Sequence, residues 1–420
     1  MTKKSDAPAI RFKGFSDAWE QRKLGDMMNV TSVKRIHQSD WTDSGVRFLR
    51  ARDIVAAAKN EEPDDYLYIS KEKYEEYSTL SGKVGVSDLL VTGVGTIGVP
   101  YLVRNLEPLY FKDGNIIWFQ NLDKIDGKFL FYSFSAEQIQ GFINESAGIG
   151  TVGTYTIESG KKTPISLPNQ IEQAKVGEFF QQLDNLITLH QRKFEKLTNV
   201  KKSMLEKMFP QNGSSYPEIR FKGFTDPWEQ RKLASLCEKF TDGDWIESKD
   251  QSDFGVRLVQ TGNVGVAEYL DKTNNKKWIS EDTFDRLHCE EVLPGDILIS
   301  RLPEPAGRAC IVPLLGTKMI TAVDCTIVRT APDMSNKFLV QYLSSQAYFD
   351  DVNTCLAGGT RQRISRGNLA NFNVPIPVKK SEQDAIGMFF GYLDNLITLH
   401  QRELEKLQNI KKSMLEKMFV

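Results

Sequence analysis

Apolar residues recur at alternating steps of four and three along two stretches, one in the middle and one at the end of the chain. This spacing keeps one narrow apolar stripe on a single side of a helix and is typical of a coiled-coil seam. The pattern therefore predicts two long helices that pair through their stripes; an amphipathic helix lying on its own domain is the alternative. The predicted seam consists of Val176, Phe180, Leu183, Ile187, His190, Phe194, Leu197, Lys201, Met204 and Met208 in the first stretch and Ile386, Phe390, Leu393, Ile397, His400, Leu404, Leu407, Lys411, Met414 and Met418 in the second.

Four of these seam positions are polar: His190, Lys201, His400 and Lys411. Neither histidine has an acid or a nucleophile beside it in the sequence, so a catalytic role is a poor interpretation. Polar seam residues fix register and partner choice at some cost in stability. We interpret these four as structural.

The segments that precede the two stretches are rich in short β-type runs bounded by Gly, Pro, Asp and Asn. Brief helical patterns follow near 128–143 and 336–352. This pattern predicts that each segment folds as a compact domain of about 150 residues with both strands and helices. The predicted strands are YLYIS, DLLVT, LYFKDGNIIWFQ, DILIS, ACIVPL and MITAVDCTIVRT.

The chain is one unit of about 210 residues written twice. The opening at 8–24 returns at 217–233 with 14 of 17 positions identical, and 179–209 returns at 389–419 with 25 of 31 identical. Between these matches the halves diverge, which indicates one framework carrying two different readers. We expect an α+β fold with two mixed domains and two helices pairing as an antiparallel coiled coil with pseudo-two-fold symmetry. The expected boundaries are 1–167 and 213–377 for the domains and 168–212 and 378–420 for the helices.

Composition places the chain in the class of water-soluble globular proteins. Its 420 residues are 40% hydrophobic and 26% charged, and no apolar run is long enough to span a bilayer. The five cysteines form no C-x-x-C pair, which argues against a disulfide frame and a zinc site. The amino-terminal segment has no apolar stretch typical of a secretory signal, so we expect a cytoplasmic protein. The net charge of −1 means that any surface for nucleic acid must be a local one.

Motifs for catalysis are missing from the sequence. Glycines at 93, 95 and 98, and again at 148, 150 and 153, match the dinucleotide fingerprint, but extended-looking residues follow each set where a helix would have to begin. We interpret them as tight turns. The sequence has no phosphate-gripping G-K-[ST] motif, no Pro-Pro pair of the kind amino-methyltransferases use, and no H-x-x-x-H spacing. We therefore expect no catalytic and no metal-binding residues.

The candidate binding surface lies in the divergent domains. No acidic residue occurs from 354 to 380, while arginines gather in the sequence TRQRISRG, and an arginine fork can grip guanine or phosphate. A solvated surface loop is the bland alternative. The aligned stretch of the first half is much less basic. The candidate DNA-binding residues are Thr92, Thr151, Thr154, Tyr155, Lys161 and Lys162 in the first half and Ser300, Arg301, Arg361, Arg363 and Arg366 in the second.

With these residues in view, the whole chain resembles the specificity subunit of Type I restriction–modification enzymes. The resemblance rests on the repeated FKGF…W-EQRKL openings, the G-D-[IL]-L strand, the Pro375, Pro377, Glu382 and Gln383 segment, and the LDNLITLHQR…KKSMLEKMF tails. The first copy departs slightly, with Ser87 in place of the glycine and with Ser166-Leu167-Pro168, which has no second proline.

The resemblance implies a non-catalytic, cytoplasmic bacterial protein that binds double-stranded DNA. Two target-recognition domains would each read one half of an asymmetric bipartite site, and the helices would set the gap. Two methyltransferase subunits and two motor-nuclease subunits would dock on this chain and use S-adenosylmethionine, ATP and Mg²⁺, with the methyl group going to adenine N6. The helix seam residues would also serve as the subunit interface.

Two other classes of function stay open on the residues alone. A stand-alone methyltransferase or nuclease is disfavoured by the missing motifs, and methyl transfer by the isolated chain would revive it. A coiled-coil adaptor that binds only proteins would show no sequence-specific retention of DNA in its assembled complex.

Overall fold

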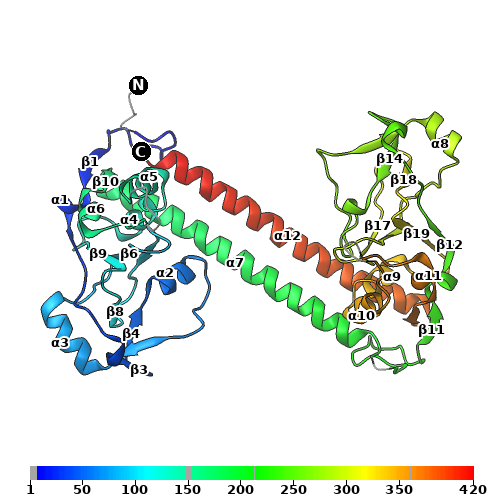
Figure 1. The fold of residues 1–420 in the computed structure, drawn as a ribbon, viewed down its shortest axis with the longest axis horizontal. Helices are drawn as coiled ribbons and strands as arrows, with labels where there is room; N and C mark the ends of the chain where they lie inside the picture. Colours follow the sequence, from blue (N-terminus) through cyan, green and yellow to red (C-terminus); the bar gives the residue numbers. More distant parts are fainter. Residues whose placement is uncertain (1–6, 148–152, 212, 359–361) are drawn as a thin grey trace. The chain divides into compact units, whose positions relative to one another are not determined.

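The computed structural model describes residues 7–147, 153–211, 213–358 and 362–420. The chain divides into two compact units, the first formed by residues 1–191 with 402–420 and the second by residues 192–401. Each unit therefore contains one mixed α/β domain together with part of each of the two long helices (Figure 1).

The described residues of the first unit form three sheets. Its strands, in chain order, are β1 (Glu20–Lys23), β2 (Asn29–Thr31), β3 (Trp41–Thr42), β4 (Val46–Leu49), β5 (Leu67–Ile69), β6 (Leu89–Thr92), β7 (Pro100–Leu102), β8 (Leu109–Phe111), β9 (Ile116–Gln120) and β10 (Pro164–Leu167). Its helices are α1 (Leu24–Met27), η1 (Gln38–Asp40), α2 (Ala51–Ala58), α3 (Lys71–Ser81), α4 (Gly127–Ser133), α5 (Glu137–Ser146), α6 (Ile157–Lys162) and the long α7 (Gln170–Met208).

The second unit repeats this plan. Its strands are β11 (Glu229–Lys232), β12 (Cys237–Asp242), β13 (Gln251–Ser252), β14 (Val256–Val259), β15 (Lys277–Ile279), β16 (Ile297–Ser300), β17 (Ala309–Ile311), β18 (Met319–Thr321), β19 (Cys325–Thr330) and β20 (Asn373–Ile376). Its helices are η2 (Leu233–Leu236), η3 (Ser248–Asp250), η4 (Thr261–Asn263), α8 (Glu281–Leu287), α9 (Asn336–Tyr342), α10 (Gln346–Thr354), α11 (Arg366–Asn371) and the long α12 (Lys380–Met418).

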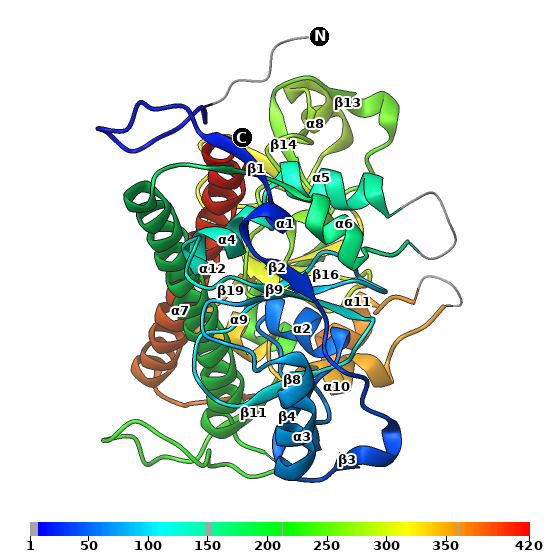
Figure 2. The same cartoon turned by 90° about the vertical axis from the view of Figure 1, so that its left-hand side faces the viewer.

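The sheets of the two units have the same topology. The orders β2-β9-β6-β7 and β3-β5-β4-β8 in the first unit correspond to β12-β19-β16-β17 and β13-β15-β14-β18 in the second. In each unit one pair is parallel, β4 with β8 and β14 with β18, and a two-stranded antiparallel ribbon, β1 with β10 or β11 with β20, stands apart. In the first unit α4, α5 and α6 lie with the first of these sheets and α3 with the second (Figures 1 and 2). The strands and short helices predicted from the sequence are confirmed.

The repeated opening segment packs against the end of a long helix. In the second unit Ile219 donates its amide hydrogen to the Lys207 carbonyl at 2.9 Å, and in the first unit Ile10 donates to the Lys417 carbonyl at 3.0 Å. The tryptophan of each opening is buried beside the phenylalanine that directly follows the helix, with Trp228 5.9 Å from Phe209 and Trp19 6.2 Å from Phe419 between ring centroids. The near-identity of these openings thus reflects one docking site used twice.

The Glu-Gln pair at each helix start explains another part of the repeat. The fully buried carboxylate of Glu172 accepts two hydrogen bonds from Arg11, at 2.6 and 2.7 Å, and Glu382 accepts two from Arg220, at 2.7 and 2.9 Å. A buried carboxylate needs such a partner because desolvation is otherwise costly. The hydrogen bonds raise the pKa of both arginines.

The adjacent glutamine joins each long helix to the mixed domain. Gln173 accepts from the Asp126 amide at 3.0 Å and donates to the Pro168 carbonyl at 2.8 Å. Gln383 makes the equivalent bonds to Ser335 at 2.9 Å and Pro377 at 3.0 Å.

A glycine in each long helix permits close contact with the domain. A Cβ at Gly177 would lie 2.9 Å or less from atoms of Asp126, Lys128 and Phe129, and one at Gly387 would lie 2.7 Å from Lys337 and Phe338. A side chain at either position would force the helix away from α4 or α9. The two glycines and the two glutamines therefore set how each domain sits on its helix.

The apolar stripes of α7 and α12 face inward, as the four-three spacing predicts. Leu183 and Ile187 in the first unit and Leu393 in the second are buried, and His190 and His400 are partly buried in the same stripe. The end of α12 packs on the first part of α7, because Leu407, Met414 and Met418 join the core that contains Phe180. The equivalent end of α7 joins the core around Phe390 with Leu197, Met204 and Met208, so the helices pair antiparallel. The remaining seam positions, Phe194, Ile397 and Leu404, are partly buried.

The glycine-rich segment after β6 is a tight loop. Gly95 and Gly98 adopt positive φ angles of 78° and 76°, and Gly98 donates its amide hydrogen to the Thr92 carbonyl at 2.7 Å. Strand β7 follows, and no helix begins there. This agrees with the interpretation as a turn; Gly148 and Gly150 lie outside the described residues. Within the described ranges, every helix is too short or too polar to span a lipid bilayer.

Candidate nucleic-acid interface

Three of the predicted arginines meet at one place in the second unit. Arg301 follows β16, Arg363 lies in the segment before α11, and Arg366 is the first residue of α11. The Ile364 amide donates a hydrogen bond to the Arg301 carbonyl at 3.1 Å, which joins the two segments. The arrangement concentrates positive charge beyond the end of β16, an inner strand of the β12-β19-β16-β17 sheet. We call Arg301, Arg363 and Arg366 the arginine cluster.

Two aspartates form loose ion pairs with the arginine cluster. Asp242 lies 3.5 Å from Arg301 and 3.9 Å from Arg366, and Asp324 lies 3.8 Å from Arg363, between the nearest nitrogen and oxygen atoms. Distances of 3.8–3.9 Å are ion pairs and not hydrogen bonds. Among the described residues, no hydrogen bond therefore occupies the guanidinium N–H donors of Arg363 and Arg366. Three positive charges face two negative ones.

Arg363 and Arg366 have exposed side chains on backbone segments that hydrogen bonds hold in place. Their side chains are 61% exposed at Arg363 and 47% at Arg366, whereas that of Arg301 is only 10% exposed. A β-bridge with Ala357 fixes the Arg363 backbone, and Ser365 caps α11 by accepting from the Asn368 amide. Arg301 donates to the Val323 carbonyl at 2.6 Å, and its Nε is buried without a hydrogen-bond partner among the described residues.

The first unit has the same backbone arrangement without the arginines. Tyr155 donates its amide hydrogen to the Gly93 carbonyl at 2.9 Å, as Ile364 does to Arg301. A Cβ at Gly93 would lie 2.6 Å from the Tyr155 carbonyl oxygen, so no side chain fits there. The Tyr155 phenol is buried against Thr163, and this burial raises its pKa.

The other sequence candidates differ in exposure. Thr92 and Ser300 are fully buried, and their hydroxyl groups bond to backbone atoms of the adjacent loops. Thr154, Lys161 and Lys162 are exposed, and Lys161 pairs with Glu158 at 2.7 Å. Thr151 and Arg361 lie outside the described residues.

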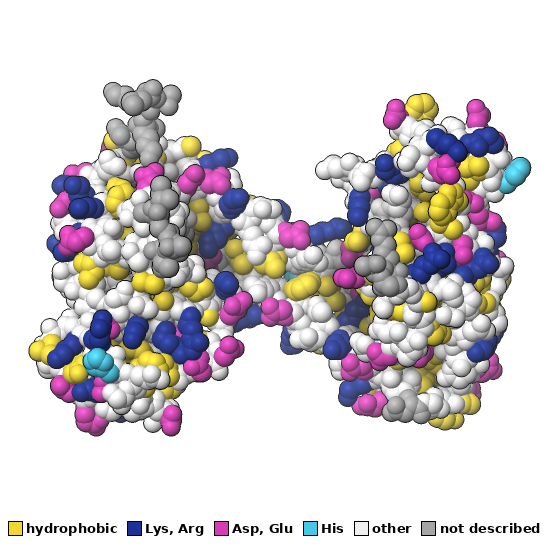
Figure 3. Space-filling model, in the orientation of Figure 1, with side chains coloured by type: hydrophobic (Ala, Val, Ile, Leu, Met, Phe, Trp, Pro, Cys, Tyr) yellow, Lys and Arg dark blue, Asp and Glu magenta, His cyan; other side chains and the backbone are white. Residues whose placement is uncertain are grey.

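A basic surface on the first unit was missed in the sequence. Lysines and arginines gather over β3, β4 and α3 (Figure 3). Lys34 and Lys73 both lie on the ring of Tyr77, with their ammonium nitrogens 4.7 and 4.5 Å from its centroid. Arg35 is 68% exposed and pairs with Asp113 at 2.8 Å. The signal was present as the Lys34-Arg35 dipeptide, which is too short to stand out from ordinary surface charge.

Trp245 occupies the position in the second unit that Arg35 occupies in the first. Arg35 lies between β2 and η1, and Trp245 lies between β12 and η3. Both 3₁₀ turns begin with a capping box, whose N-cap residue is His37 in the first unit and Glu247 in the second. Trp245 is 72% exposed. The backbone before it is linked to the arginine cluster, because the Asp244 carbonyl accepts from the Val323 amide and the Val323 carbonyl accepts from Arg301. Exposed tryptophan beside arginine is unusual for a plain solvated surface and typical of binding sites.

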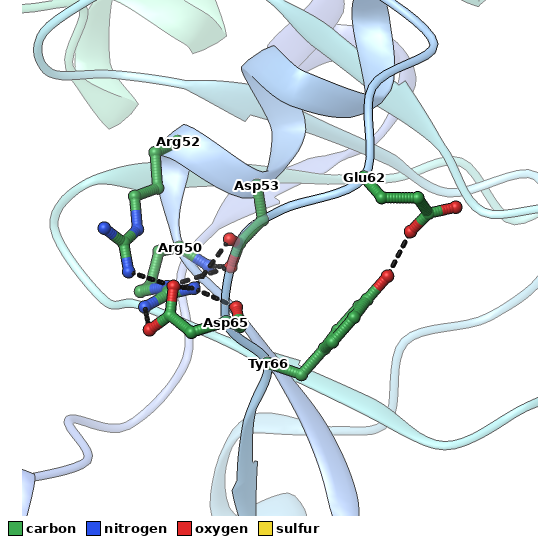
Figure 4. Close-up of polar contacts among 6 residues, drawn as sticks. All are labelled: Arg50, Arg52, Asp53, Glu62, Asp65 and Tyr66. Carbon is green, nitrogen blue, oxygen red and sulfur yellow. Dashed lines mark hydrogen bonds and ion pairs between the residues drawn. The ribbon is translucent and has the colours of Figure 1, made fainter. Parts of the chain in front are cut away.

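The first unit has a different arginine group, Arg50 and Arg52, whose role is structural. Arg50 bonds both oxygens of Asp53 and both oxygens of Asp65, while Arg52 bonds Asp65 at 2.6 Å (Figure 4). These carboxylates raise the pKa of Arg50 despite the opposing effect of its burial. The same figure shows Tyr66 directed toward Glu62. The network holds α2 and the loop after it, and all three guanidinium nitrogens of Arg50 already donate hydrogen bonds.

The cysteines and acidic residues form no metal-binding group in the described parts of the chain, where no three His, Cys, Asp or Glu residues gather in a suitable arrangement. All five cysteines are unpaired thiols. Burial raises the pKa of Cys310 to about 12 and that of Cys325 to about 11.

The family model of the Type I restriction modification DNA specificity domain matches the chain twice, at residues 16–199 and 225–409. The chain belongs to this family. The two matches coincide with the two halves of the internal repeat. The specificity subunit therefore carries two copies of one DNA-specificity domain, and the predicted family and fold class are confirmed.

Curated relatives carry the same designation. The specificity subunit is 24% identical over 301 residues to the Type I restriction enzyme MjaVIII specificity subunit of Methanocaldococcus jannaschii, covering 69% of each chain. It is 25% identical over 416 residues to the putative MjaX specificity subunit of the same organism, covering 94% of this chain and 92% of the relative. The crystal structure of a Type I restriction–modification S subunit from M. genitalium has the same fold, with a TM-score of 0.64 over 99% of both chains at 13% identity.

Proposed function

We propose that each mixed domain of this specificity subunit reads one half of an asymmetric, two-part DNA site. Two copies of a DNA-specificity domain with different exposed side chains support this proposal. Identical readers would select identical half-sites, whereas Arg301 in one unit stands where Gly93 stands in the other. Different chemistry on one framework therefore favours two different half-sites.

The observation that carries the proposal for the second half-site is the arginine cluster. No hydrogen bond to a described residue occupies the N–H donors of Arg363 and Arg366, and arginine donates two parallel hydrogen bonds to guanine O6 and N7 or to phosphate. Arg361 lies in the same acid-free segment of the sequence and is part of this proposal. Trp245 adds an aromatic face beside the cluster, suitable for stacking on a base or sugar.

For the first half-site we assign the exposed polar residues of the equivalent surface. These are Thr154, Lys161 and Lys162 around α6, together with Lys34 and Arg35 of the loop after β2. Lysine favours phosphate as a point charge, and Arg35 alone among these offers a planar fork. The domain that reads the first half-site would then depend more on contacts to DNA phosphates than the domain that reads the second.

We further propose that α7 and α12 act as the spacer that sets the gap between the half-sites. Segments 168–212 and 378–420 would form this spacer, and 1–167 and 213–377 the two recognition domains. A rigid pair of helices fixes a distance in proportion to its length, at ~1.5 Å per residue.

Catalysis would belong to the partners of this chain. Methyltransferase subunits would supply S-adenosylmethionine and transfer the methyl group to adenine N6, and motor-nuclease subunits would use ATP and Mg²⁺. This chain would act in the cytoplasm as the non-catalytic subunit that selects the site.

Reconstitution tests the proposal. The purified chain, its partner methyltransferase, and both together would be incubated with genomic DNA and S-adenosylmethionine, and N6-methyladenine would be mapped. We expect methylation only with both proteins present, at one two-part sequence. Methylation by this chain alone would establish an enzyme. An assembled complex that retains no DNA sequence selectively would establish a protein adaptor.

A further inference from the structure

We propose that two ion pairs, Lys411 with Asp184 and Lys201 with Asp394, fix the register in which α7 and α12 pair, and through it the gap between the half-sites. The inference rests on the proposed spacer function. Apolar seams attract helices to each other but discriminate poorly between neighbouring registers. A charged pair at one defined position discriminates well, since a misplaced charge loses its partner.

In the first unit the pair forms part of a three-element contact. The Lys411 ammonium lies 2.6 Å from one carboxylate oxygen of Asp184, and the Tyr132 hydroxyl donates to the other at 2.7 Å. Lys411 also lies 5.6 Å from the centroid of the Tyr132 ring. Tyr132 belongs to α4 and is fully buried, and its burial and its bond to Asp184 raise the pKa of the phenol, which remains a donor. The contact thus joins α12, α7 and the recognition domain.

The second unit repeats the contact with a different donor. The Lys201 ammonium lies 2.5 Å from one carboxylate oxygen of Asp394, and the Gln341 amide of α9 donates to the other at 2.8 Å. Gln341 is 3% exposed. Tyrosine in one domain and glutamine in the other perform the same task, so the two divergent domains have each kept a donor for this aspartate.

Both pairs specify one register. In an antiparallel pair the numbers of facing residues have a constant sum, and 184 with 411 and 201 with 394 both give 595. The helices of the two units therefore agree on a single alignment. The lysine side chains are 14% and 27% exposed, and both aspartates are 28% exposed, so the charges are partly withdrawn from water.

A slip by one heptad would keep the apolar seam and lose both ion pairs. With a sum of 602, Lys201 would face Gln401 and Lys411 would face Gln191. With a sum of 588, the same lysines would face Gly387 and Gly177. Neither alternative places an acid directly opposite a lysine.

The aspartates fare worse in the slipped registers. With a sum of 602, Asp184 would face Met418 and Asp394 would face Met208. With a sum of 588, they would face Leu404 and Phe194. A carboxylate placed against an apolar side chain is costly, so both registers are selected against.

The experiment measures gap preference in the complex with the partner methyltransferase. DNA substrates carry the two half-sites with gaps that vary by one base pair, and initial methylation rates are compared. The variants are Lys201→Asp with Lys411→Asp, Asp184→Lys with Asp394→Lys, and all four changes together. Lys202→Asp with Lys412→Asp is the matched control, since both residues are exposed neighbours with the same change in charge.

We expect the wild-type chain and the control to prefer one gap. Each double variant, with either both lysines or both aspartates reversed in charge, should lower the preference for that gap over its neighbours by at least ~10-fold. This change corresponds to ~1.4 kcal/mol. The fourfold change should restore the preference, since it rebuilds both pairs with reversed sign. The Tyr132 hydroxyl and the Gln341 carbonyl can accept from a lysine in the new arrangement.

Unchanged gap preference in both charge-reversed chains would overturn the inference, as would a folded fourfold variant without recovery. Where a reversed chain does not fold, Asp184→Asn with Asp394→Asn replaces it, because asparagine still accepts from Tyr132 and Gln341. Unchanged preference in that variant would equally overturn the inference. Failure of the proposed function is distinct, since the wild-type complex itself would then show no preferred gap.

Discussion

The Ile364 amide donates a hydrogen bond to the Arg301 carbonyl at 3.1 Å, and the Tyr155 amide makes the same bond to Gly93 at 2.9 Å. In both units the same backbone hydrogen bond thus holds the segment before α6 or α11 beside the end of β6 or β16. In the second unit the framework carries arginines, and in the first it leaves no room for a side chain at Gly93. The two units therefore present different chemistry to a ligand on a common framework.

Single changes in the arginine cluster separate base reading from phosphate binding. Arg363→Ala or Arg366→Ala should cost ~1–3 kcal/mol of binding free energy and relax one base position if the arginine reads a base. A phosphate contact should instead weaken all sequences alike and reduce the salt slope by about one. Binding of the assembled complex to DNA at several salt concentrations measures both. Arg231→Ala, at a partly exposed arginine on β11, is the control; wild-type behaviour in all cluster variants would remove the cluster from the interface.

Trp245 should contribute through its aromatic face. Trp245→Ala should weaken binding to the second half-site by ~1–3 kcal/mol, the range for one stacked base, and Trp245→Phe should retain most of the affinity. Fluorescence anisotropy with DNA that carries one altered half-site at a time provides the measurement. Equal affinity of the alanine and wild-type chains would argue against stacking.

The buried ion pair at the helix start should matter for stability. Arg220→Ala leaves the Glu382 carboxylate, which is 2% exposed, without its arginine, and breaking such a pair costs about 3–5 kcal/mol. Lys207→Ala removes an exposed pair with Glu218 and should cost under ~1 kcal/mol. Urea unfolding of both variants compares the two. A smaller loss for Arg220→Ala than for Lys207→Ala would contradict the assigned role.

Longer helices should lengthen the gap. Four residues inserted after Lys196 and four after Lys406 add ~6 Å to each helix. Because DNA rises ~3.4 Å per base pair, the preferred gap should grow by one or two base pairs while both half-sites stay the same. The insertion shifts the phase of the seam, so some loss of stability is expected. Methylation of substrates with varied gaps is the assay, and an active insertion variant with the original gap would show that the helices are not the spacer.

Much of the fold could be predicted from the sequence because its signals are local or repeated. The four-three spacing predicts both long helices, and self-similarity predicts two domains of one design. The buried Arg220–Glu382 pair could not be predicted, since its partners are 162 residues apart and only packing brings them together. The same holds for Asp184, which the seam pattern passes over because it lies beside the stripe.

The candidate site was only partly predictable for a related reason. Composition identifies the arginines around 361–366, but burial decides which residues are accessible, and Thr92 and Ser300 are enclosed within the fold. Trp245 and Arg35 are single residues in unremarkable stretches. Only their equivalent places before the two capping turns single them out.

Exchange of one recognition domain tests the central claim most directly. Residues 25–165 would be replaced by the corresponding segment of another family member, and N6-methyladenine would be mapped across the genome of cells carrying the chimera and the partner methyltransferase. The parent chain should give one asymmetric two-part sequence, and the chimera should change one half while the other half and the gap stay constant. A change in both halves, or a single undivided sequence for the parent, would contradict two independent readers.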